Sequence, residues 1–300
     1  MEKNLDVSEI IFKIFSYLFV TVFALLCLYP FIFVLSAAFS GVNALNNGEV
    51  VLFPVDFQTD SFGVIMLKNQ FWISYTNTLF ITLYGTLWSV ITSMLGAYAL
   101  SKKRLVFRRQ LNFLLVFTMW FSAGMVPTYL NYLDTQNVLQ ALAITDNKWL
   151  IVLAMGTSAY NVILLRNAFE SVPKEIEEAA TVDGASEFQI FKNVYVPMSK
   201  ATIATVSLFF GISRWNGYFW ARQMLASDPN AQPLQVYIRD QMETYVAKNA
   251  GGDPNPWMEA GSAQAFIYAM IICAIVPIII IYPFIQKYFA VGVNLGGVKE

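Results

Sequence analysis

The residues best suited to binding chemistry fall in one short segment. It combines aromatic rings, cationic groups, an amide and a glycine, in the order Gly211, Arg214, Trp215, Asn216, Tyr218 and Arg222. Indole and phenol rings stack on flat apolar surfaces, while guanidinium and amide groups donate hydrogen bonds to hydroxyl or carboxylate oxygens. At helical spacing Gly211 and Trp215 share one face, and Tyr218 and Arg222 continue it. The segment therefore predicts a surface that binds a polar ligand.

Catalytic chemistry has little support in the sequence. The chain has no histidine and only two cysteines, Cys27 and Cys273, both within apolar runs where they act as small hydrophobic residues. The absence of histidine excludes histidine-based acid–base catalysis and the usual zinc sites. No G-x-x-x-x-G-K-[ST] loop is present, so any ATP must bind to another chain. The net charge of −1 gives no basic field for nucleic acid.

The composition indicates a membrane protein. Of the 300 residues, 57% are hydrophobic and 13% are charged, whereas soluble domains carry about 25% charged residues. A membrane-spanning helix needs about 20 mainly apolar residues. Six segments meet this requirement: 13–39, 75–100, 112–133, 149–169, 201–221 and 265–286. None shows the alternation of a β-barrel strand, so we predict an all-α membrane protein with six transmembrane helices.

The distribution of lysine and arginine predicts the orientation. With the N-terminus inside, 13 of the 19 lysine and arginine residues fall on the inner side, five fall outside, and Arg214 lies within the fifth span. The short basic loop 102–109 is the strongest determinant. We therefore expect cytoplasmic N- and C-termini, with a cytoplasmic segment at 1–12 and a single membrane domain at 13–300.

Small residues predict close helix packing. Gly85, Ser89, Ser93 and Ala97 recur at every fourth position of the second span. A second stripe of the same spacing begins at Gly261 and continues through Ala265, Ala269 and Cys273. Pro277 and Pro283 follow it and are expected to bend the last helix.

The polar segment 173–197, called the insert below, separates two apolar spans. Pro173 suits a first helical turn, and Gly184 can adopt the left-handed conformation that ends a helix. Ser186 and Gln189 have capping-box spacing, which predicts the start of a second helix. This helix carries Phe188, Phe191 and Tyr195 on one apolar face and closes at Pro197. The insert is thus predicted to be a helical elbow, the other interpretation being an ordinary amphipathic interfacial loop.

The insert resembles the EAA loop of bacterial ABC importer permeases. The similarity lies in Glu178, Ala179 and Ala180, then Asp183, Gly184 and Ala185, with Phe191 and Pro197 downstream. Further similarity to the MalG/LplC branch of carbohydrate permeases lies in 121–129, 165–167, 215–216, 233–235 and 286–297. The resemblance implies the type I importer permease fold. It also implies a coupling role for nine residues: Glu178, Ala179, Ala180, Asp183, Gly184, Ala185, Phe188, Phe191 and Pro197.

The resemblance implies a non-catalytic subunit of the bacterial plasma membrane that imports carbohydrate, an oligosaccharide that is neutral or acidic. The implied partners are a second homologous permease, two ATP-binding subunits that hold ATP and magnesium, and an extracytoplasmic solute-binding protein. The chain itself is expected to hold no cofactor or metal, and to contact lipid but no nucleic acid.

The predicted sugar pathway includes the 211–222 segment and two residues of the third span, Tyr129 and Asn131. At ~1.5 Å per residue, Arg214 lies roughly 20 Å into the membrane, where a charge must face the bundle interior or water. Arg214 or Arg222 is then expected to pair with a uronate carboxylate or with sugar hydroxyls. Other interpretations remain open: Tyr218 as part of an aromatic belt, Arg222 as an anchor, Arg214 as an ion-pair partner of a neighbouring subunit, and Tyr129 and Asn131 as packing residues.

Three rival functions also remain open. An ABC importer permease for a non-sugar solute fits the same motifs. An ion-coupled secondary transporter is less favoured, because proton relays use intramembrane acidic or histidine residues and the spans hold few acidic residues. An intramembrane enzyme would need a metal cluster, a Ser–His pair or a carboxylate dyad, and the sequence supplies none.

Overall fold

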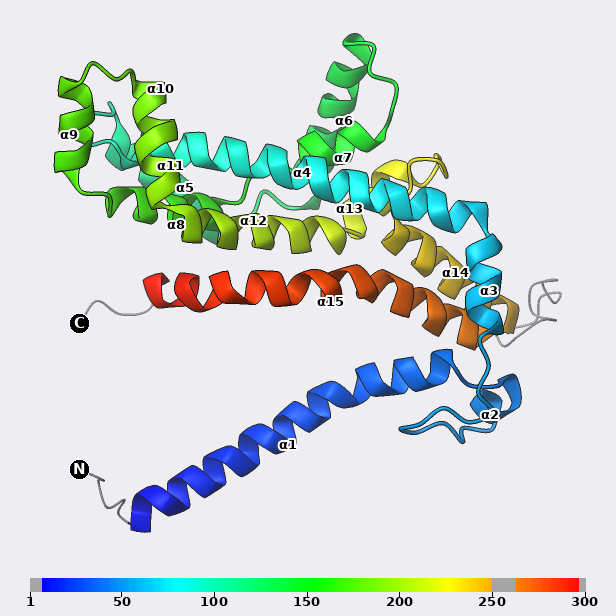
Figure 1. The fold of residues 1–300 in the computed structure, drawn as a ribbon. Coiled ribbons are helices and arrows are strands. Elements are labelled where there is room, and N and C mark those ends of the chain that lie inside the picture. The colour runs from blue at the N-terminus through cyan, green and yellow to red at the C-terminus, as the bar shows by residue number, and fades with distance from the viewer. Residues whose placement is uncertain (1–6, 250–262, 297–300) are drawn as a thin grey trace. The chain divides into compact units, whose positions relative to one another are not determined.

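The computed structural model describes the backbone of residues 7–249 and 263–296, with side chains for 8–244 and 264–283. The described residues contain helices and no strand (Figure 1). In chain order the helices are α1 Val7–Ala38, α2 Val42–Asn46, α3 Asp60–Leu67, α4 Asn69–Ser101, α5 Arg108–Trp120, α6 Met125–Ala141, α7 Lys148–Ala154, α8 Ala159–Glu170, α9 Lys174–Val182, α10 Glu187–Ile190, η1 Phe191–Tyr195, α11 Val196–Met198, α12 Lys200–Trp215, α13 Phe219–Leu225, α14 Leu234–Asn249 and α15 Ala263–Gly296. The predicted all-α class is therefore confirmed.

The described residues form two compact units. The first contains the chain up to Asn69 together with the segment from Ile238 to Pro277. Its core joins the end of α1 and the short helix α2 to the start of α15, through Ala37, Leu45 and Ala265. Most of α1 exposes large apolar side chains. Such a surface is unfavourable in water and suits contact with lipid.

The second unit contains residues 70–237 and the end of the chain from Ile278. One of its cores packs α4, α8 and α12 against the insert, around Phe169 and Val206. Another packs α4 with α6, α7 and α13, around Leu150 and Leu225. Because α4 contributes to both cores, it connects the insert to the broken helices near the other end of this unit (Figure 1).

Among the described residues, three helices are long and apolar enough to cross a membrane: Ser8–Ala38, Asn69–Ser101 and Gln264–Pro283. The third and fourth predicted spans correspond to bent pairs of helices, and the fifth begins just after the bend of another pair. The bend between α5 and α6 is 115°, that between α7 and α8 is 54°, and that between α11 and α12 is 84°. The structure thus supports three to six spans. The third and fourth predicted spans bend within their length, whereas the bend at Ser199 lies just before the fifth.

The bends occur where the backbone cannot continue an α-helix. Gly124 (φ +87°) precedes α6 and Gly156 (φ +52°) lies in the link between α7 and α8. These left-handed conformations favour glycine because it has no Cβ. Before the third bend, Pro197 lacks an N–H and cannot bond to the carbonyl of Asn193. The chain forms the π-turn η1 before Pro197 and bends at Ser199.

The fifth predicted span, 201–221, is also wrong at its C-terminal end. Helix α12 ends at Trp215, and α13 begins a new helix at Phe219. A Cβ on Gly217 would lie 3.2 Å from the carbonyl oxygen of Arg214, so only glycine fits this turn without a shift. The helical face expected to run from Gly211 to Arg222 therefore stops at Trp215.

The predicted small-residue stripe of α4 is confirmed as a packed surface. Its four members, Gly85, Ser89, Ser93 and Ala97, are all buried. In the other stripe Ala265 and Ala269 are buried and Cys273 is half-buried, whereas Gly261 lies outside the described residues. Helix α15 continues through both Pro277 and Pro283.

Candidate functional site

The turn of the insert has the geometry that Gly184 predicts. After α9 ends, Gly184 adopts φ +78° and its N–H donates to the carbonyl of Thr181. The N–H of Ala185 donates to the carbonyl of Ala180 at 3.0 Å. These two bonds form a Schellman motif, which satisfies carbonyls left free at the helix end. The direction of the elbow is therefore fixed by backbone geometry.

The second helix of the insert begins with the predicted capping box. The Ser186 hydroxyl accepts from the N–H of Gln189, and the Ser186 N–H donates to the Gln189 side chain at 2.7 Å. The helix continues as η1 and α11 and passes Pro197 before ending at Met198. Pro197 therefore lies within the last turn and does not close the helix at its own position, which corrects that detail.

The insert has one buried side and one exposed side. Phe191 and Tyr195 are buried, and Ala180 and Ala185 pack partly buried against the same core. The predicted face is not uniform, because the Phe188 side chain is 67% exposed. Val182, which the sequence interpretation missed, is 87% exposed beside the turn. Five further coupling residues are exposed: Glu178, Ala179, Asp183, Gly184 and Pro197.

A buried ionic network connects α9 to the end of α4. Lys102 Nζ donates to Glu177 Oε1 at 2.5 Å and to the Tyr195 hydroxyl at 3.0 Å. That hydroxyl in turn donates to Glu177 Oε2 at 2.5 Å. Burial alone would raise the pKa of Glu177, but the hydrogen bonds from Lys102 and Tyr195 outweigh it and lower this pKa. Glu177 is therefore held as a carboxylate between α4, α9 and η1.

A second set of contacts connects α10 to the same end of α4. The Tyr98 hydroxyl donates to Glu187 Oε2 at 2.9 Å, and Arg104 forms an ion pair with Glu187. The Tyr98 ring also contacts the rings of Phe191 and Tyr195, with centroids 5.1 and 5.0 Å apart. Both helices of the insert are thus attached to α4 through different side chains.

Arg214 is bound within the chain at the break between α7 and α8. Its Nη1 donates to the carbonyl of Ile151 at 3.1 Å, and its Nη2 donates to Ser89 Oγ at 2.7 Å and to the carbonyl of Gly156 at 3.2 Å. The residue is 4% exposed. A helix break leaves carbonyls without intrahelical partners, and Arg214 supplies donors to two of them. We call Arg214 and these three acceptors the Arg214 clamp.

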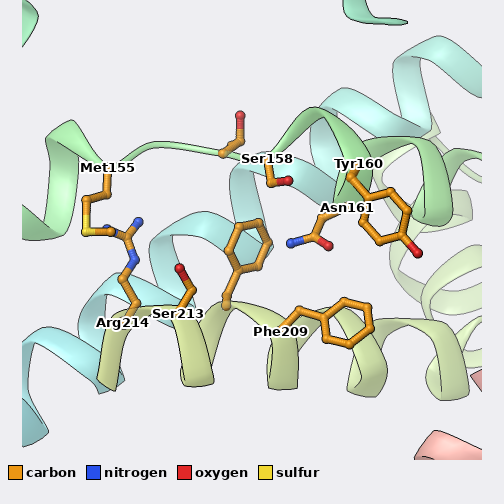
Figure 2. Close-up of a pocket in the computed structure, with 9 residues that line it drawn as sticks. Met155, Ser158, Tyr160, Asn161, Phe209, Ser213 and Arg214 are labelled. Carbon is orange, nitrogen blue, oxygen red and sulfur yellow. The ribbon is translucent and has the colours of Figure 1, made fainter. Parts of the chain in front are cut away.

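A cavity of about 390 Å³ lies beside the Arg214 clamp. Its lining comes from the link between α7 and α8, from α8 and from α12, and consists of Met155, Thr157, Ser158, Tyr160, Asn161, Phe209, Phe210, Ser213 and Arg214. Figure 2 shows Arg214, Ser213 and Phe209 on α12, facing Met155, Ser158 and Asn161 across the opening. Aromatic surface and short polar groups together suit a ligand with apolar faces and hydroxyls.

Of the predicted pathway residues, Arg214 is the one that lines this cavity. Trp215 is buried against the Tyr75 ring, 6.2 Å between centroids. Asn216 is exposed in the turn after α12. Arg222 lies on α13, and its side chain donates a hydrogen bond to the hydroxyl of Tyr218, the residue just before that helix.

The two candidates of the third span lie elsewhere in the unit. Tyr129 and Asn131 are exposed on α6, beyond the 115° bend. Neither lines the cavity beside Arg214. Their predicted role in a sugar pathway stays a prediction.

The sequence interpretation missed Tyr160, Asn161 and Ser213. No motif marks these residues, but the Gly156-Thr157-Ser158 sequence within an apolar run is a signal of a helix break. A break inside a predicted span places free backbone groups and polar side chains around a cavity. That signal could have directed attention to α8.

No group of three or more His, Cys, Asp or Glu side chains in the described part of the chain is arranged to hold a metal. Cys27 is exposed on α1 and Cys273 is half-buried, and both thiols are free.

Comparison with known proteins agrees with this architecture. A family described as "Binding-protein-dependent transport system inner membrane component" matches residues 105–294. The polygalacturonan/rhamnogalacturonan transport system permease protein YtcP of Bacillus subtilis is 36% identical, over 96% of this chain and 98% of that protein. Protein LplC of Bacillus subtilis is 32% identical, over 96% of this chain and 95% of that protein.

A solved structure has the same fold. It is a chain of a bacterial ABC transporter involved in the import of the acidic polysaccharide alginate, with 39% sequence identity and a TM-score of 0.84. The similarity covers 96% of this chain and 99% of that chain.

Proposed function

Because the chain belongs to the family of binding-protein-dependent transport system inner membrane components, we propose that it imports an acidic oligosaccharide. The protein is a non-catalytic, multi-pass permease subunit of the bacterial inner membrane, with the ABC importer permease fold. The proposal concerns its cargo, its partners and the residues that couple transport to ATP.

The acidic cargo is supported by two relatives. One is named for polygalacturonan, by its name a polymer of a sugar acid, and the other takes part in the import of alginate, an acidic polysaccharide. The cavity beside the Arg214 clamp supplies suitable chemistry. The Tyr160 and Phe209 rings stack on sugar faces, and Asn161 and Ser213 hydrogen-bond to hydroxyls. The clamp uses three of the five N–H groups of Arg214, so Nε–H and one Nη1–H remain for a hydroxyl or carboxylate oxygen of the sugar.

The predicted pathway residues outside this cavity remain part of the proposal. Trp215, Asn216, Tyr218, Arg222, Tyr129 and Asn131 would contact cargo at other stages of its passage. We place 13–300 in one membrane domain, with both termini in the cytoplasm.

The coupling proposal rests on one observation: both helices of the insert are attached to α4, and α4 also forms part of the Arg214 clamp. Thirteen residues separate Ser89 from Lys102, or about 20 Å of helix. A movement of the insert therefore displaces a helix that reaches the broken span. The exposed side of the turn, with Val182 and Phe188, would dock into an ATP-binding subunit.

The proposed assembly has this chain beside a second homologous permease. Two ATP-binding subunits hold ATP and magnesium, and an extracytoplasmic protein delivers the oligosaccharide. ATP binding closes the two ATP-binding subunits against each other, and the inserts of the two permeases transmit this movement to the membrane helices.

The test is uptake by the complete transporter in proteoliposomes, with acidic and neutral oligosaccharides of equal length. We expect ATP-dependent uptake of the acidic sugar that continues when ion gradients are collapsed. Uptake that stops with the gradient would contradict the ATP-driven mechanism. Equal uptake of the neutral sugar would contradict the proposed preference for an acidic cargo, but it would leave the ATP-driven mechanism intact.

A second measurement tests the docking surface separately. A cysteine in place of Val182 should form a cross-link with the ATP-binding subunit, since this side chain is exposed at the turn. A cysteine in place of Ala265, which is buried in the first unit, is the control and should give none. Labelling of the Val182 position from outside the cell would overturn both the docking and the orientation.

A further inference from the structure

A basic cleft lies where α4 ends and α5 begins. It has a volume of about 520 Å³ and is lined by Lys103, Arg108, Arg109, Asn112, Arg166 and Glu170. Four cationic side chains thus face one carboxylate, which leaves an excess of three positive charges. We call this group of six residues the basic cleft.

Internal contacts hold two of the cations in place. Arg108 forms an ion pair with Glu170, and its Nε donates to the carbonyl of Leu100 at 2.9 Å. Arg166 donates to the Asn112 side chain and lies 3.6 Å from Glu170. The Arg166 Nε is buried and is the atom that faces Glu170, at a distance too long for a hydrogen bond. These two arginines therefore shape the cleft.

The other two cations are available. Lys103 and Arg109 are exposed, and neither lies within 4 Å of a carboxylate in the part of the chain that the structure describes. A concave site with unpaired cations attracts an anion that can accept several hydrogen bonds. Phosphate oxygens have this property.

An exposed apolar pair lies beside these cations. Val106 and Phe107 are 70% and 68% exposed in the short link between the two helices. Phe107 also has φ +59°, an unusual conformation for a bulky residue. The link follows α4, which is itself a candidate membrane span, so it lies at a membrane surface. An apolar tip next to cations matches the acyl and phosphate regions of a lipid.

We propose that the basic cleft binds the phosphate of an anionic phospholipid headgroup. Lys103 and Arg109 contact the phosphate directly, and Val106 and Phe107 enter the acyl region. A free phosphate ion shares the chemistry of the headgroup but has no acyl chain to contact Val106 and Phe107. The lipid is therefore the favoured ligand. A site of this kind lies next to the insert, since Arg104 of the same link pairs with Glu187.

The experiment measures phospholipid binding to the purified full-length chain by native mass spectrometry. Wild-type protein should bind phosphatidylglycerol at least about tenfold more tightly than phosphatidylcholine. Each cation near a membrane surface contributes about fivefold to the binding of an anionic lipid, so the double variant Lys103→Gln/Arg109→Gln should lose about 25-fold. Lys13→Gln, which removes a cation from α1, should leave the affinity unchanged.

A second variant separates lipid from free phosphate. Phe107→Asn removes the apolar tip and introduces a residue that tolerates a positive φ, so folding should be retained or improved. It should weaken phosphatidylglycerol binding and leave the binding of inorganic phosphate unchanged.

Three results would overturn the proposal. The first is equal binding of phosphatidylglycerol and phosphatidylcholine by wild-type protein. The second is displacement of phosphatidylglycerol by inorganic phosphate at a similar concentration, which would assign the cleft to a free ion. The third is a double variant that keeps its lipid affinity but no longer assembles with an ATP-binding subunit, which would assign the cleft to a protein contact.

Discussion

Arg214 on α12 donates a 2.7 Å hydrogen bond to the hydroxyl of Ser89 on α4, and the same guanidinium donates to the carbonyls of Ile151 and Gly156. A single side chain therefore holds three segments of the unit together: α12, α4 and the break between α7 and α8. A charge in a predicted span suggests contact with cargo, but three of its hydrogen bonds are used for structure. This arrangement makes the surroundings of Arg214 sensitive to small changes in volume.

Gly85→Ala should destabilise the protein. A Cβ at this position would lie 3.1 Å from the Cδ and Nε of Arg214, which is buried and held by three hydrogen bonds. Such overpacking costs about 1–3 kcal/mol, more than the ~0.5–1 kcal/mol gained by replacing glycine in a helix. Gly96→Ala on the same helix is the matched control, because nothing lies within 4 Å of its Cβ. Thermal unfolding should show a lower midpoint for the first variant and a higher one for the second.

Arg214→Gln should reduce the uptake of acidic and neutral oligosaccharides to the same degree. The shorter amide leaves the carbonyl of Ile151 without its donor, at a cost of about 1–3 kcal/mol. The carbonyl of Gly156 loses one of its two donors and keeps the hydroxyl of Ser89 at 2.6 Å. Both substrates then lose transport through the same loss of structure. Uptake assays with the two sugars, alongside protein abundance, test this. A selective loss of the acidic sugar would instead show that Arg214 recognises its carboxylate.

Glu177→Gln should lower stability at neutral pH and have no effect in acid. The folded-state pKa of Glu177 is lowered, so the carboxylate stabilises the fold above its unfolded pKa, about 4.3, and this contribution is lost as the pH falls through the folded pKa. Unfolding curves of wild type and variant, recorded from pH 7 downward, should therefore begin to converge below the unfolded pKa and meet only below the folded one. Curves that stay parallel across this range would show that Glu177 is not held as an anion.

Much of the local structure of the insert could be predicted from its sequence. The left-handed Gly184 and the capping box of Ser186 and Gln189 depend on backbone groups within a few residues, so local sequence specifies them. The sequence also predicts the small-residue stripe of α4, because a helix places every fourth residue on one face. The predicted coupling roles of these residues concern partners, and they stay predictions.

The site around Arg214 could not be predicted in the same way. Its three acceptors lie 58 to 125 residues away along the chain, so they depend on tertiary packing. Hydropathy also hides the break at Gly156, because the residues on both sides remain largely apolar. An ideal helix extended beyond Trp215 would place Tyr218 and Arg222 on the same face as Gly211. The observed helix α12 ends at Trp215, so that face does not reach them. Phe188 is exposed and Phe191 is buried, and this difference also depends on tertiary packing. Their spacing predicts that they share one side of the helix, but it does not predict how deeply each is buried.

Substitution of these two phenylalanines should separate docking from folding. Phe188→Ala removes a side chain that is 67% exposed and should change the unfolding free energy by less than about 0.5 kcal/mol. Phe191→Ala removes a buried ring of the core and should cost about 3–5 kcal/mol. We therefore expect Phe188→Ala to assemble as a folded permease whose cargo no longer stimulates ATP hydrolysis. Normal stimulation in this variant would place the docking contact elsewhere on the insert.

Substitutions at Gly184 should reveal whether the direction of the elbow matters for transport. Nothing lies within 4 Å of a Cβ at this position, so the cost of a side chain there comes from the backbone alone. At φ +78°, Gly184→Ala should cost about 1–2 kcal/mol, whereas Gly184→Asn should cost less because asparagine tolerates this region. If the Schellman turn sets the position of Val182 and Phe188 against the motor subunit, ATP-driven uptake should fall in the order glycine, asparagine, alanine. Ser199→Ala, at the bend between α11 and α12, removes a buried hydroxyl that has no partner among the described residues, and is the control that should retain uptake. Equal uptake by the wild type and both Gly184 variants would show that the ATP-binding subunit holds the elbow in place without help from its turn.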